Sequence, residues 1–512
     1  MSYAQRLPVE LREFLGLPGP QSLLVRGPPG SGKTTLCLAM LEAAAGTRIL
    51  VTSRVSQGEL HRGFPWLGDN GGSTIQIVDT TALEARIRDI GRATAARDGV
   101  MLAEGPASRD FAEFFWLPPS VQDAWSRLPS DSPSLVVIDS WDALVEQYMG
   151  GAGPHVEELP DRAEVERILL RQLGKSRAHV IIVLERRDET QLDYLVNGVV
   201  VTERTMGNDR LERWLHLPKL RGIRIANGYY PYTVEGAKFQ CIEPIRAYAD
   251  IRKGQYDAEP DPMPGHLWPG SRAFADSFGR LPVGKTTLIE SDSEVQDQII
   301  QIFLGPMIAA VANQGGRALL IPSPSLSAKE IWESVKGSAS RARLEQSFRV
   351  VDVTGQFEGI ARHTAPELAK MIAPLRSILP SAPPAPGTTT PPDTEVRKFL
   401  TGGVAGSPVL AATYVSGFTS LAATLRIPMT PDQVDTFPAM VQSSLGTTPM
   451  HSIMMGRTGV PLFESVRSLA AIHLHLRVRQ GRVFVYGSKP WTSGFVLAEG
   501  SDATPYELLR IV

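Results

Sequence analysis

One nine-residue segment near the start of the chain constrains the fold more than any other feature. It follows a short apolar run and precedes a helical stretch, and it matches the G-x-x-x-x-G-K-[ST] pattern of a phosphate-binding loop. Glycines let the backbone wrap closely around a phosphate chain, and the N–H groups of the loop and of the next helix then point at the anion. The segment consists of Gly27, Pro28, Pro29, Gly30, Ser31, Gly32, Lys33, Thr34 and Thr35.

The last residues of this loop have distinct expected roles. Lys33 is expected to reach the β- and γ-phosphates of ATP, and the Thr34 hydroxyl to bind Mg²⁺, with Thr35 beside it. A glycine-rich turn that only caps a helix is the alternative, and the full match between a strand and a helix argues against it. The sequence therefore predicts ATP and Mg²⁺ as cofactors.

A second acidic signal lies about a hundred residues downstream. Residues 134–138 form an apolar run that ends at Asp139, which predicts a buried strand with one carboxylate at its carboxyl end. Beside a phosphate-binding loop, such a carboxylate holds the hydration shell of Mg²⁺. We expect Asp139 and Thr34 to form the metal site.

Composition excludes several classes of protein. The chain has 512 residues, which is too long for one ordinary core, and 43% hydrophobic and 21% charged residues, as in globular proteins. Its formal net charge of −2 gives no support to nucleic acid as a partner. Cys37 and Cys241 lie outside any metal-binding spacing, and no apolar run has the length of a membrane span. We expect a cytoplasmic protein without a membrane segment.

An ordered set of segments resembles the RecA-like ATPases of the KaiC/RadA type, over about residues 15 to 245. The set comprises the strand ending at Asp139, residues 194–200, residues 217–222 and residues 230–234. In that family, basic residues of the third segment reach the γ-phosphate bound by a neighbouring subunit of a ring. The resemblance implies that Lys219 and Arg221 act in this way. It also implies that the protein either forms a homo-oligomer, of which a ring is one form, or acts on a protein partner.

The chain departs from this family at one position. In the KaiC type, the strand that matches residues 49–52 is followed by two glutamates that activate water, whereas this chain has Arg54 and Val55. A guanidinium stays protonated and is a poor general base. Either another acid, such as Glu59 or Glu185, replaces them, or the protein binds ATP and hydrolyses it slowly. We favour slow hydrolysis.

The second half repeats the order of elements of the first. Residues 281–290, 317–323, 348–353 and 409–416 match the strands of the first half in sequence. The segment Gly284–Thr287 copies the end of a phosphate-binding loop, but it lacks the upstream glycines and precedes its strand. The segment after that strand, 291–294, is acidic and would repel phosphate. The second half is therefore expected to bind no nucleotide.

These patterns predict an α/β protein of two tandem RecA-like domains with largely parallel central sheets, the second degenerate. The expected boundaries are residues 1–247 for the ATP-binding domain, 248–264 for a Pro-rich linker and 265–512 for the degenerate domain. Residues 380–393 form a Pro/Thr-rich loop. His473 and His475 share one strand face and hint at a metal, but no third ligand is near in sequence, which favours an ordinary surface strand.

Three functions fit this sequence. The first is an ATP-binding regulator or assembly factor with weak ATPase activity, because the arrangement also resembles the GvpD-like gas-vesicle regulators within the KaiC-like group. The second is a DNA-dependent ATPase of the RecA/RadA type, against which the near-neutral charge argues. The third is a small-molecule phosphotransferase, which needs an acceptor pocket and a catalytic carboxylate that the sequence does not reveal.

Overall fold

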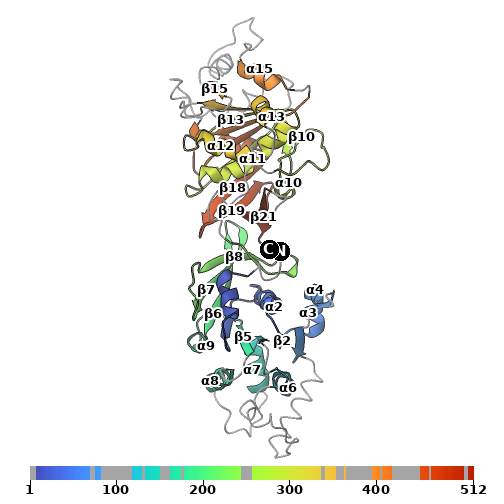
Figure 1. The fold of residues 1–512 in the computed structure, drawn as a ribbon, viewed down its shortest axis with the longest axis vertical. Helices are drawn as coiled ribbons and strands as arrows, with labels where there is room; N and C mark the ends of the chain where they lie inside the picture. The colour runs from blue at the N-terminus through green and yellow to red at the C-terminus, as the bar shows by residue number, and fades with distance from the viewer. Residues whose placement is uncertain are drawn as a thin grey trace, which may run out of the picture. The chain divides into compact units, whose positions relative to one another are not determined.

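A computed structural model divides the chain into two compact units. Unit 1 comprises residues 1–243 with 511–512, and unit 2 comprises residues 244–510. Each unit is an α/β body with helices around one large sheet (Figure 1). The structure describes residues 7–69, 75–81, 118–129, 133–149, 162–173, 178–243, 256–335, 341–352, 362–364, 395–403, 406–417, 450–460, 463–500 and 505–512.

Unit 1 contains a nine-stranded sheet in the order β3-β2-β4-β5-β1-β6-β7-β8-β9. Strands β3 to β6 in this order run parallel, and the hairpin β6–β7 begins the antiparallel edge. The strands are β1 (Ser22–Arg26), β2 (Thr47–Thr52), β3 (Ile75–Asp79), β4 (Ser134–Asp139), β5 (Ala178–Leu184), β6 (Gly198–Gly207), β7 (Arg210–Leu220), β8 (Tyr229–Thr233) and β9 (Gln240–Cys241).

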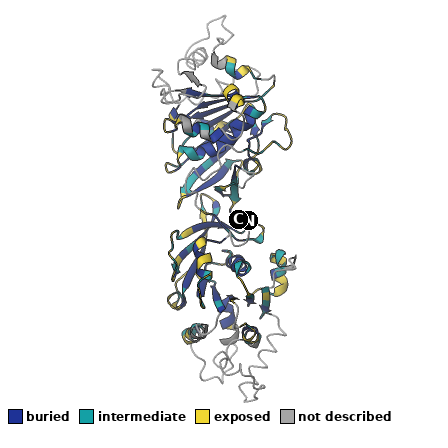
Figure 2. Ribbon diagram, viewed as in Figure 1, coloured by how far each residue is buried: buried dark blue, intermediate teal, exposed yellow. Residues whose placement is uncertain are grey.

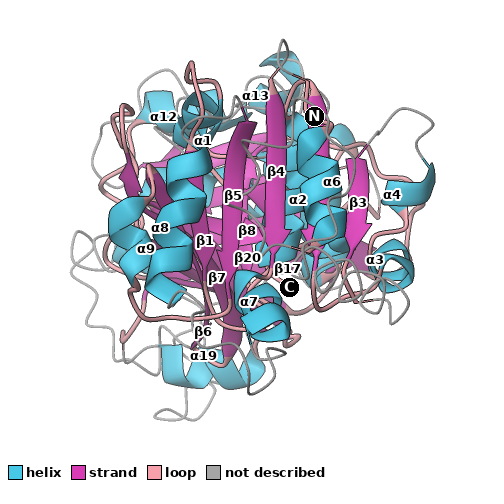
Figure 3. Ribbon diagram, turned by 90° about the horizontal axis from the view of Figure 1, so that it is seen from below, coloured by secondary structure: helices cyan, strands magenta, loops and turns pink. Residues whose placement is uncertain are grey.

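The central strands are apolar on both faces, since helices cover the sheet on both sides. In β1, Val25 packs into a core with Leu36 of α2, whereas Leu24 faces the opposite core with Trp141 of α7. This alternation is expected for a strand buried between two helical layers. Figure 3 shows helices around β4 and β5. The helices are α1 (Val9–Leu15), α2 (Lys33–Ala43), α3 (Gln57–Gly63), α4 (Trp66–Asp69), α6 (Pro119–Ser126), α7 (Trp141–Met149), α8 (Arg162–Leu173) and α9 (Gln191–Leu195), with a 3₁₀ turn at Glu235–Ala237.

Unit 2 contains a ten-stranded sheet in the order β15-β14-β13-β16-β17-β12-β18-β19-β20-β21. The two sheets have the same strand order if β12 is matched to β1 and the later strands are matched in chain order with β15 left out. Nine strands then correspond, and β15 is an added strand at one edge. The strands are β12 (Thr286–Ser291), β13 (Arg317–Ile321), β14 (Phe348–Asp352), β15 (Arg362–Thr364), β16 (Val409–Tyr414), β17 (Met450–Arg457), β18 (Ile472–Arg479), β19 (Arg482–Lys489), β20 (Phe495–Glu499) and β21 (Tyr506–Arg510).

The main core of unit 2 lies between its sheet and the long helix α11. This helix is buried over most of its length, and Phe303 and Met307 pack against Ile289 of the sheet. Leu288, the neighbour of Ile289, faces the opposite side, where it packs against Phe463 of α19. The strands of both units are mostly buried (Figure 2). The helices are α10 (Arg272–Phe278), α11 (Asp297–Asn313), α12 (Ala328–Val335), α13 (Arg341–Ser347), α15 (Glu395–Thr401) and α19 (Phe463–Leu469), and β10 (His266–Leu267) and β11 (Leu281–Pro282) form a small separate sheet.

The two sheets confirm the predicted fold class, an α/β protein with two largely parallel central sheets in tandem. Within the described residues, no helix combines the length and apolarity that crossing a membrane requires. Residues 256–264, part of the expected linker, form neither helix nor strand. Residues 248–255 and the Pro/Thr-rich loop 380–393 lie outside the described residues.

Candidate nucleotide-binding site

The loop between β1 and α2 has a backbone that glycine makes possible. Gly32 has a φ of 85°, a left-handed conformation that other residues rarely adopt. A Cβ on Gly27 would lie 2.3 Å from the carbonyl oxygen of Thr202, so no side chain fits there. The amide of Ser31 donates to the carbonyl of Pro28 (3.2 Å), which closes a turn within the loop. The loop is therefore both tightly turned and pressed against β6.

Side chains from the neighbouring antiparallel strands hold the loop in place. Ser31 Oγ lies 2.7 Å from Thr202 Oγ1 at the end of the parallel part of β6. Arg213 of β7 donates to the carbonyl of Gly30 (2.8 Å), and the Tyr232 hydroxyl of β8 donates to the carbonyl of Ser31. Burial raises the pKa of Tyr232, so its hydroxyl stays protonated as a donor. Three strands thus fix the loop geometry before any ligand binds.

Lys33 begins helix α2 and lies buried across the loop. Its Nζ donates to the carbonyl oxygens of Gly27 (3.0 Å) and Pro28 (2.9 Å). Burial lowers the pKa of Lys33, and the carboxylates of Glu185 and Asp139 oppose this shift. A phosphate chain in the loop would offer the ammonium stronger, charged acceptors than these carbonyls.

Asp139 and Thr34 meet at the carboxyl edge of the parallel strands. Asp139 ends β4, whose register with β2 places it beside Thr52, and Thr34 lies in the first turn of α2. Thr34 Oγ1 donates to Asp139 Oδ2 over 2.6 Å. Burial raises the pKa of Asp139, while the hydrogen bond from Thr34 and the charge of Lys33 act in the opposite direction. A hydroxyl and a carboxylate are hard oxygen donors, so this pair fits Mg²⁺ chemically.

Two of the acids considered from the sequence have different surroundings. Glu59 closes the N-terminus of α3, because its carboxylate accepts from the amide and the hydroxyl of Ser56 (2.9 and 2.8 Å). Glu185 follows β5 and forms an ion pair with the guanidinium of Arg54. Glu185 also acts electrostatically on Lys33, so of the two acids Glu59 and Glu185 it is Glu185 that lies near the loop.

Lys219 and Arg221 lie at another place in the sheet. The amide of Arg221 bonds to the carbonyl of Asn197 (2.9 Å), at the level of Ser22 where β1 begins, so Arg221 is far along the strand from the loop that follows β1. The Lys219 ammonium donates to the carbonyl of Asp193 (2.8 Å) in α9. Burial and then the charge of Arg221 lower the pKa of Lys219. These two residues do not join Lys33, Thr34 and Asp139 within one chain.

The hairpin β6–β7 brings two further arginines to the loop that the sequence reasoning missed. Arg204 and Arg213 lie opposite each other in the hairpin register. Besides the bond from Arg213 to Gly30, Arg204 Nη1 would lie 3.4 Å from a Cβ placed on Gly30, so it is close to the loop tip. Only the register of a long hairpin places these side chains, and the sequence contains no motif that reveals it.

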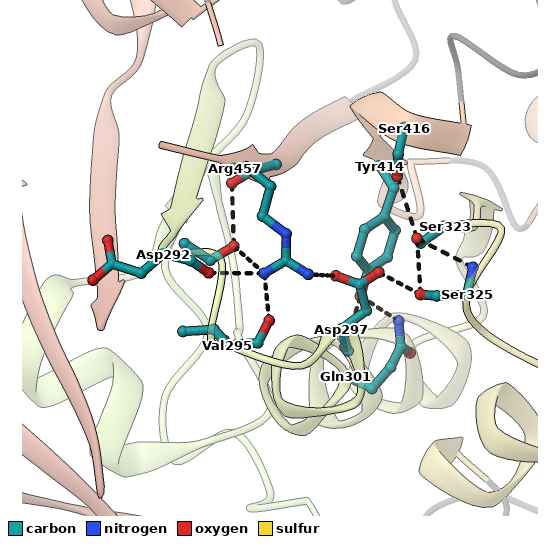
Figure 4. Close-up of polar contacts among 11 residues, drawn as sticks. Asp292, Val295, Asp297, Gln301, Ser323, Ser325, Tyr414, Ser416 and Arg457 are labelled. Carbon is teal, nitrogen blue, oxygen red and sulfur yellow. Dashed lines mark hydrogen bonds and ion pairs between the residues drawn. The ribbon is translucent and has the colours of Figure 1, made fainter. Parts of the chain in front are cut away.

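In unit 2, an arginine side chain occupies the turn that corresponds to the loop between β1 and α2. Arg457 ends β17 and points into the turn between β12 and α11 (Figure 4). It donates to the carbonyls of Asp292 (2.8 Å) and Val295, and its other Nη atom pairs with Asp297 Oδ1 (3.0 Å). The turn thus presents carbonyl oxygens to a cation, the opposite polarity to a phosphate-binding loop.

The residues that begin α11 and end β16 also differ in charge from those at the matching positions of unit 1. Asp297 begins α11, as Lys33 begins α2, and Tyr414 ends β16, as Asp139 ends β4. The Tyr414 hydroxyl donates to the Asp297 carbonyl (3.2 Å) and accepts from Gln301 (2.8 Å). At these matching positions unit 2 has an acid and a phenol, where unit 1 has a lysine and a carboxylate.

Comparison with known proteins finds similarity to two curated proteins. Protein GvpD1 of Halobacterium salinarum is 27% identical over 272 residues, which cover 50% of this chain and 44% of that protein. Protein GvpD2 of the same organism is 29% identical over 260 residues, or 46% of this chain and 44% of that protein. The chain thus spans less than half the length of these relatives, and no family model matches it. The resemblance that the motifs indicate is confirmed: the chain has two tandem RecA-like sheets and is similar, over about half its length, to the GvpD proteins.

Proposed function

We propose that the chain binds ATP and Mg²⁺ in unit 1, hydrolyses ATP slowly, and acts as a nucleotide-dependent regulator or assembly factor. The observation that supports ATP and Mg²⁺ most directly is the 2.6 Å contact between Thr34 and Asp139, beside a loop that already has its glycine-dependent turn. The regulatory role is supported by the similarity to the GvpD proteins.

In this proposal each residue has one task. The backbone of the loop binds the β-phosphate, and Lys33 leaves the carbonyls of Gly27 and Pro28 to bind the β- and γ-phosphates. Thr34 and Asp139 hold Mg²⁺, which neutralises charge on the phosphate oxygens when it is bound. The second unit, with Arg457 in the corresponding turn, contributes no nucleotide site.

Slow hydrolysis follows from the pairing of Arg54 with Glu185. The carboxylate oxygen that bonds to Arg54 is not available to accept a proton from the attacking water. Glu59 is occupied in capping α3.

Calorimetric titration with ATP and Mg²⁺, together with phosphate release, tests this function. We expect one ATP per chain, turnover far below the ~10 s⁻¹ that is typical of enzymes, and loss of binding in Lys33→Ala. Lys285→Ala is the matched control, because Lys285 belongs to the similar sequence Gly284–Thr287 but lies exposed before its strand. Asp139→Asn should retain nucleotide binding but weaken its dependence on Mg²⁺. Equal binding by wild type and Lys33→Ala would refute the proposal.

A further inference from the structure

Two histidines and a glutamate of unit 2 converge on one face of adjacent strands. Glu290 lies on β12 and is paired in register with His475 on β18, and His473 lies two residues earlier on the same strand face. One ligand atom from each of the three side chains lies within 4.8 Å of the others. The structure thus supplies the third ligand that the sequence did not reveal, and β18 is not an ordinary surface strand here: His473 is 5% exposed.

The glutamate of this cluster is buried yet charged. Glu290 is fully buried, and Arg467 of α19 donates to both of its carboxylate oxygens (2.5 and 2.8 Å). These two bonds hold the carboxylate in one orientation beside the histidines. A carboxylate oxygen is therefore available there as a metal ligand.

His475 has a buried nitrogen that no described residue satisfies. Its Nδ1 makes no hydrogen bond, although a buried polar atom without a partner costs free energy. A neutral imidazole with a free lone pair is the form that binds metals.

The outer nitrogens of both rings contact one hydroxyl. Ser488 Oγ lies 2.7 Å from His473 Nδ1 and 3.3 Å from His475 Nε2. The nitrogens left over are His473 Nε2, which lies 2.8 Å from Glu290 Oε1, and the unpartnered Nδ1 of His475. In metal proteins, a hydrogen bond to the outer nitrogen typically fixes the tautomer and the orientation of a ligating histidine. Ser488 is placed to do this for both rings.

The corresponding face of unit 1 shows that the fold does not require this cluster. There, β6 presents Val199 and Val201, which pack into an apolar core. Unit 1 also has an ion pair at the place of Glu290 and Arg467, but with the charges exchanged: Arg26 lies on the strand β1 and Asp193 on the helix α9. The fold therefore uses an ion pair at this place in both units, but unit 1 has no counterpart of the buried His473 and the half-buried His475.

We propose that Glu290, His473 and His475 form a Zn²⁺ site that links β12 to β18. Two imidazoles and one carboxylate are a ligand set that zinc uses, with water in the remaining position of a tetrahedron. Binding requires the Nε2 proton of His473 to leave to solvent or to move to Nδ1, where Ser488 accepts it. Arg467 retains its bond to Oε2 of Glu290 and so orients the carboxylate, while the metal binds Oε1, the oxygen beside His473.

Zinc binding to the full chain tests this site without nucleotide. Chelator-treated protein is titrated with Zn²⁺ by calorimetry, and with Co²⁺ by visible absorption, in which tetrahedral coordination gives strong bands between about 500 and 700 nm. We expect one metal per chain, and at least ~10-fold weaker binding with loss of the bands in His473→Gln and His475→Gln. His266→Gln is the control, since His266 lies in the same unit outside the cluster.

Two results would overturn the site. One is the absence of stoichiometric zinc binding by the wild type, and the other is equal binding by wild type, His475→Gln and His266→Gln. Circular dichroism of each variant identifies those that fail to fold. Ser488→Ala gives a second test, since it leaves all three ligands in place and is expected to weaken zinc binding by ~10-fold through loss of the outer-nitrogen contacts.

Discussion

The guanidinium of Arg54 and the carboxylate of Glu185 form an ion pair near the loop between β1 and α2, although the two residues are 131 positions apart in the chain. They follow β2 and β5, two parallel strands on either side of β4, so their loops share one edge of the sheet. In the KaiC-type ATPases, which the sequence resembles, a glutamate follows the matching strand at the position of Arg54. The pair therefore links the position of Arg54 to an acid that acts electrostatically on Lys33.

Removing Arg54 should accelerate hydrolysis. In Arg54→Ala, Glu185 loses its partner and becomes free to accept a proton from water, and a positioned base contributes about 10²-fold or more to such reactions. Because the new base is not optimally placed, we expect ~10-fold faster phosphate release in single turnover, with ATP affinity little changed. Arg62→Ala, in the last turn of α3, is the control. A fall in turnover would instead mean that Arg54 itself stabilises charge on the γ-phosphate.

Arg221 should matter only between protomers. It is exposed and far along the sheet from its own loop, so Arg221→Ala should leave ATP binding unchanged. If a ring forms, the variant should lower turnover, and mixing it with Lys33→Ala protein should restore part of the activity at mixed interfaces. Mass photometry with and without ATP and Mg²⁺ measures assembly. A monomer under both conditions would rule out a role in trans.

Arg457 should stabilise unit 2 without affecting the binding of ATP. Its replacement by alanine leaves the carbonyls of Asp292 and Val295 and the carboxylate of Asp297 without this donor, and such losses typically cost about 1–3 kcal/mol. We expect a lower melting temperature and the same ATP affinity. Lys285→Ala, which removes an exposed cation of the same unit, should change neither quantity. An unchanged melting temperature in Arg457→Ala would mean that these contacts do not stabilise unit 2.

Mild acid should destabilise unit 2 through His451. This side chain is fully buried on β17, bonded to Thr287 Oγ1 (2.9 Å) and to the carbonyl of Pro282 (2.8 Å), and burial lowers its pKa to about 4 from 6.5. Between these values the unfolded chain binds a proton that the folded chain does not. Stability from this group is therefore complete above about pH 6.5 and falls as the pH drops toward 4, by ~3 kcal/mol in total.

Hydrogen exchange of the β17 segment between pH 7 and pH 4.5, corrected for the intrinsic rate, measures this loss of stability. His451→Gln should flatten the dependence on pH, even if it lowers stability overall, because glutamine does not titrate. His266→Gln, outside the buried strands, should retain the wild-type slope. An unchanged slope in His451→Gln would assign the acid sensitivity to another group, with His475 as the first candidate.

The sequence by itself determined the elements whose physical signals are local. Apolar runs fixed the parallel strands, and the glycines before Lys33 fixed a turn that other residues cannot adopt. It also indicated that the second half repeats the first, since the runs around residues 319, 350 and 411 recur in the same order. The parallel-strand rule then brought the carboxyl ends of β1 and β4 to one edge, and with them Thr34 and Asp139.

Only the tertiary structure decided which distant side chains meet. The pairing of Arg54 with Glu185, the entry of Arg457 into the turn after β12, and the convergence of Glu290 on His473 and His475 all depend on strand order and register. Shifting β18 by one residue, for example, would turn His473 and His475 to the opposite face of the sheet, away from Glu290. Strand register is set by the packing of the whole core, which no short segment of sequence encodes.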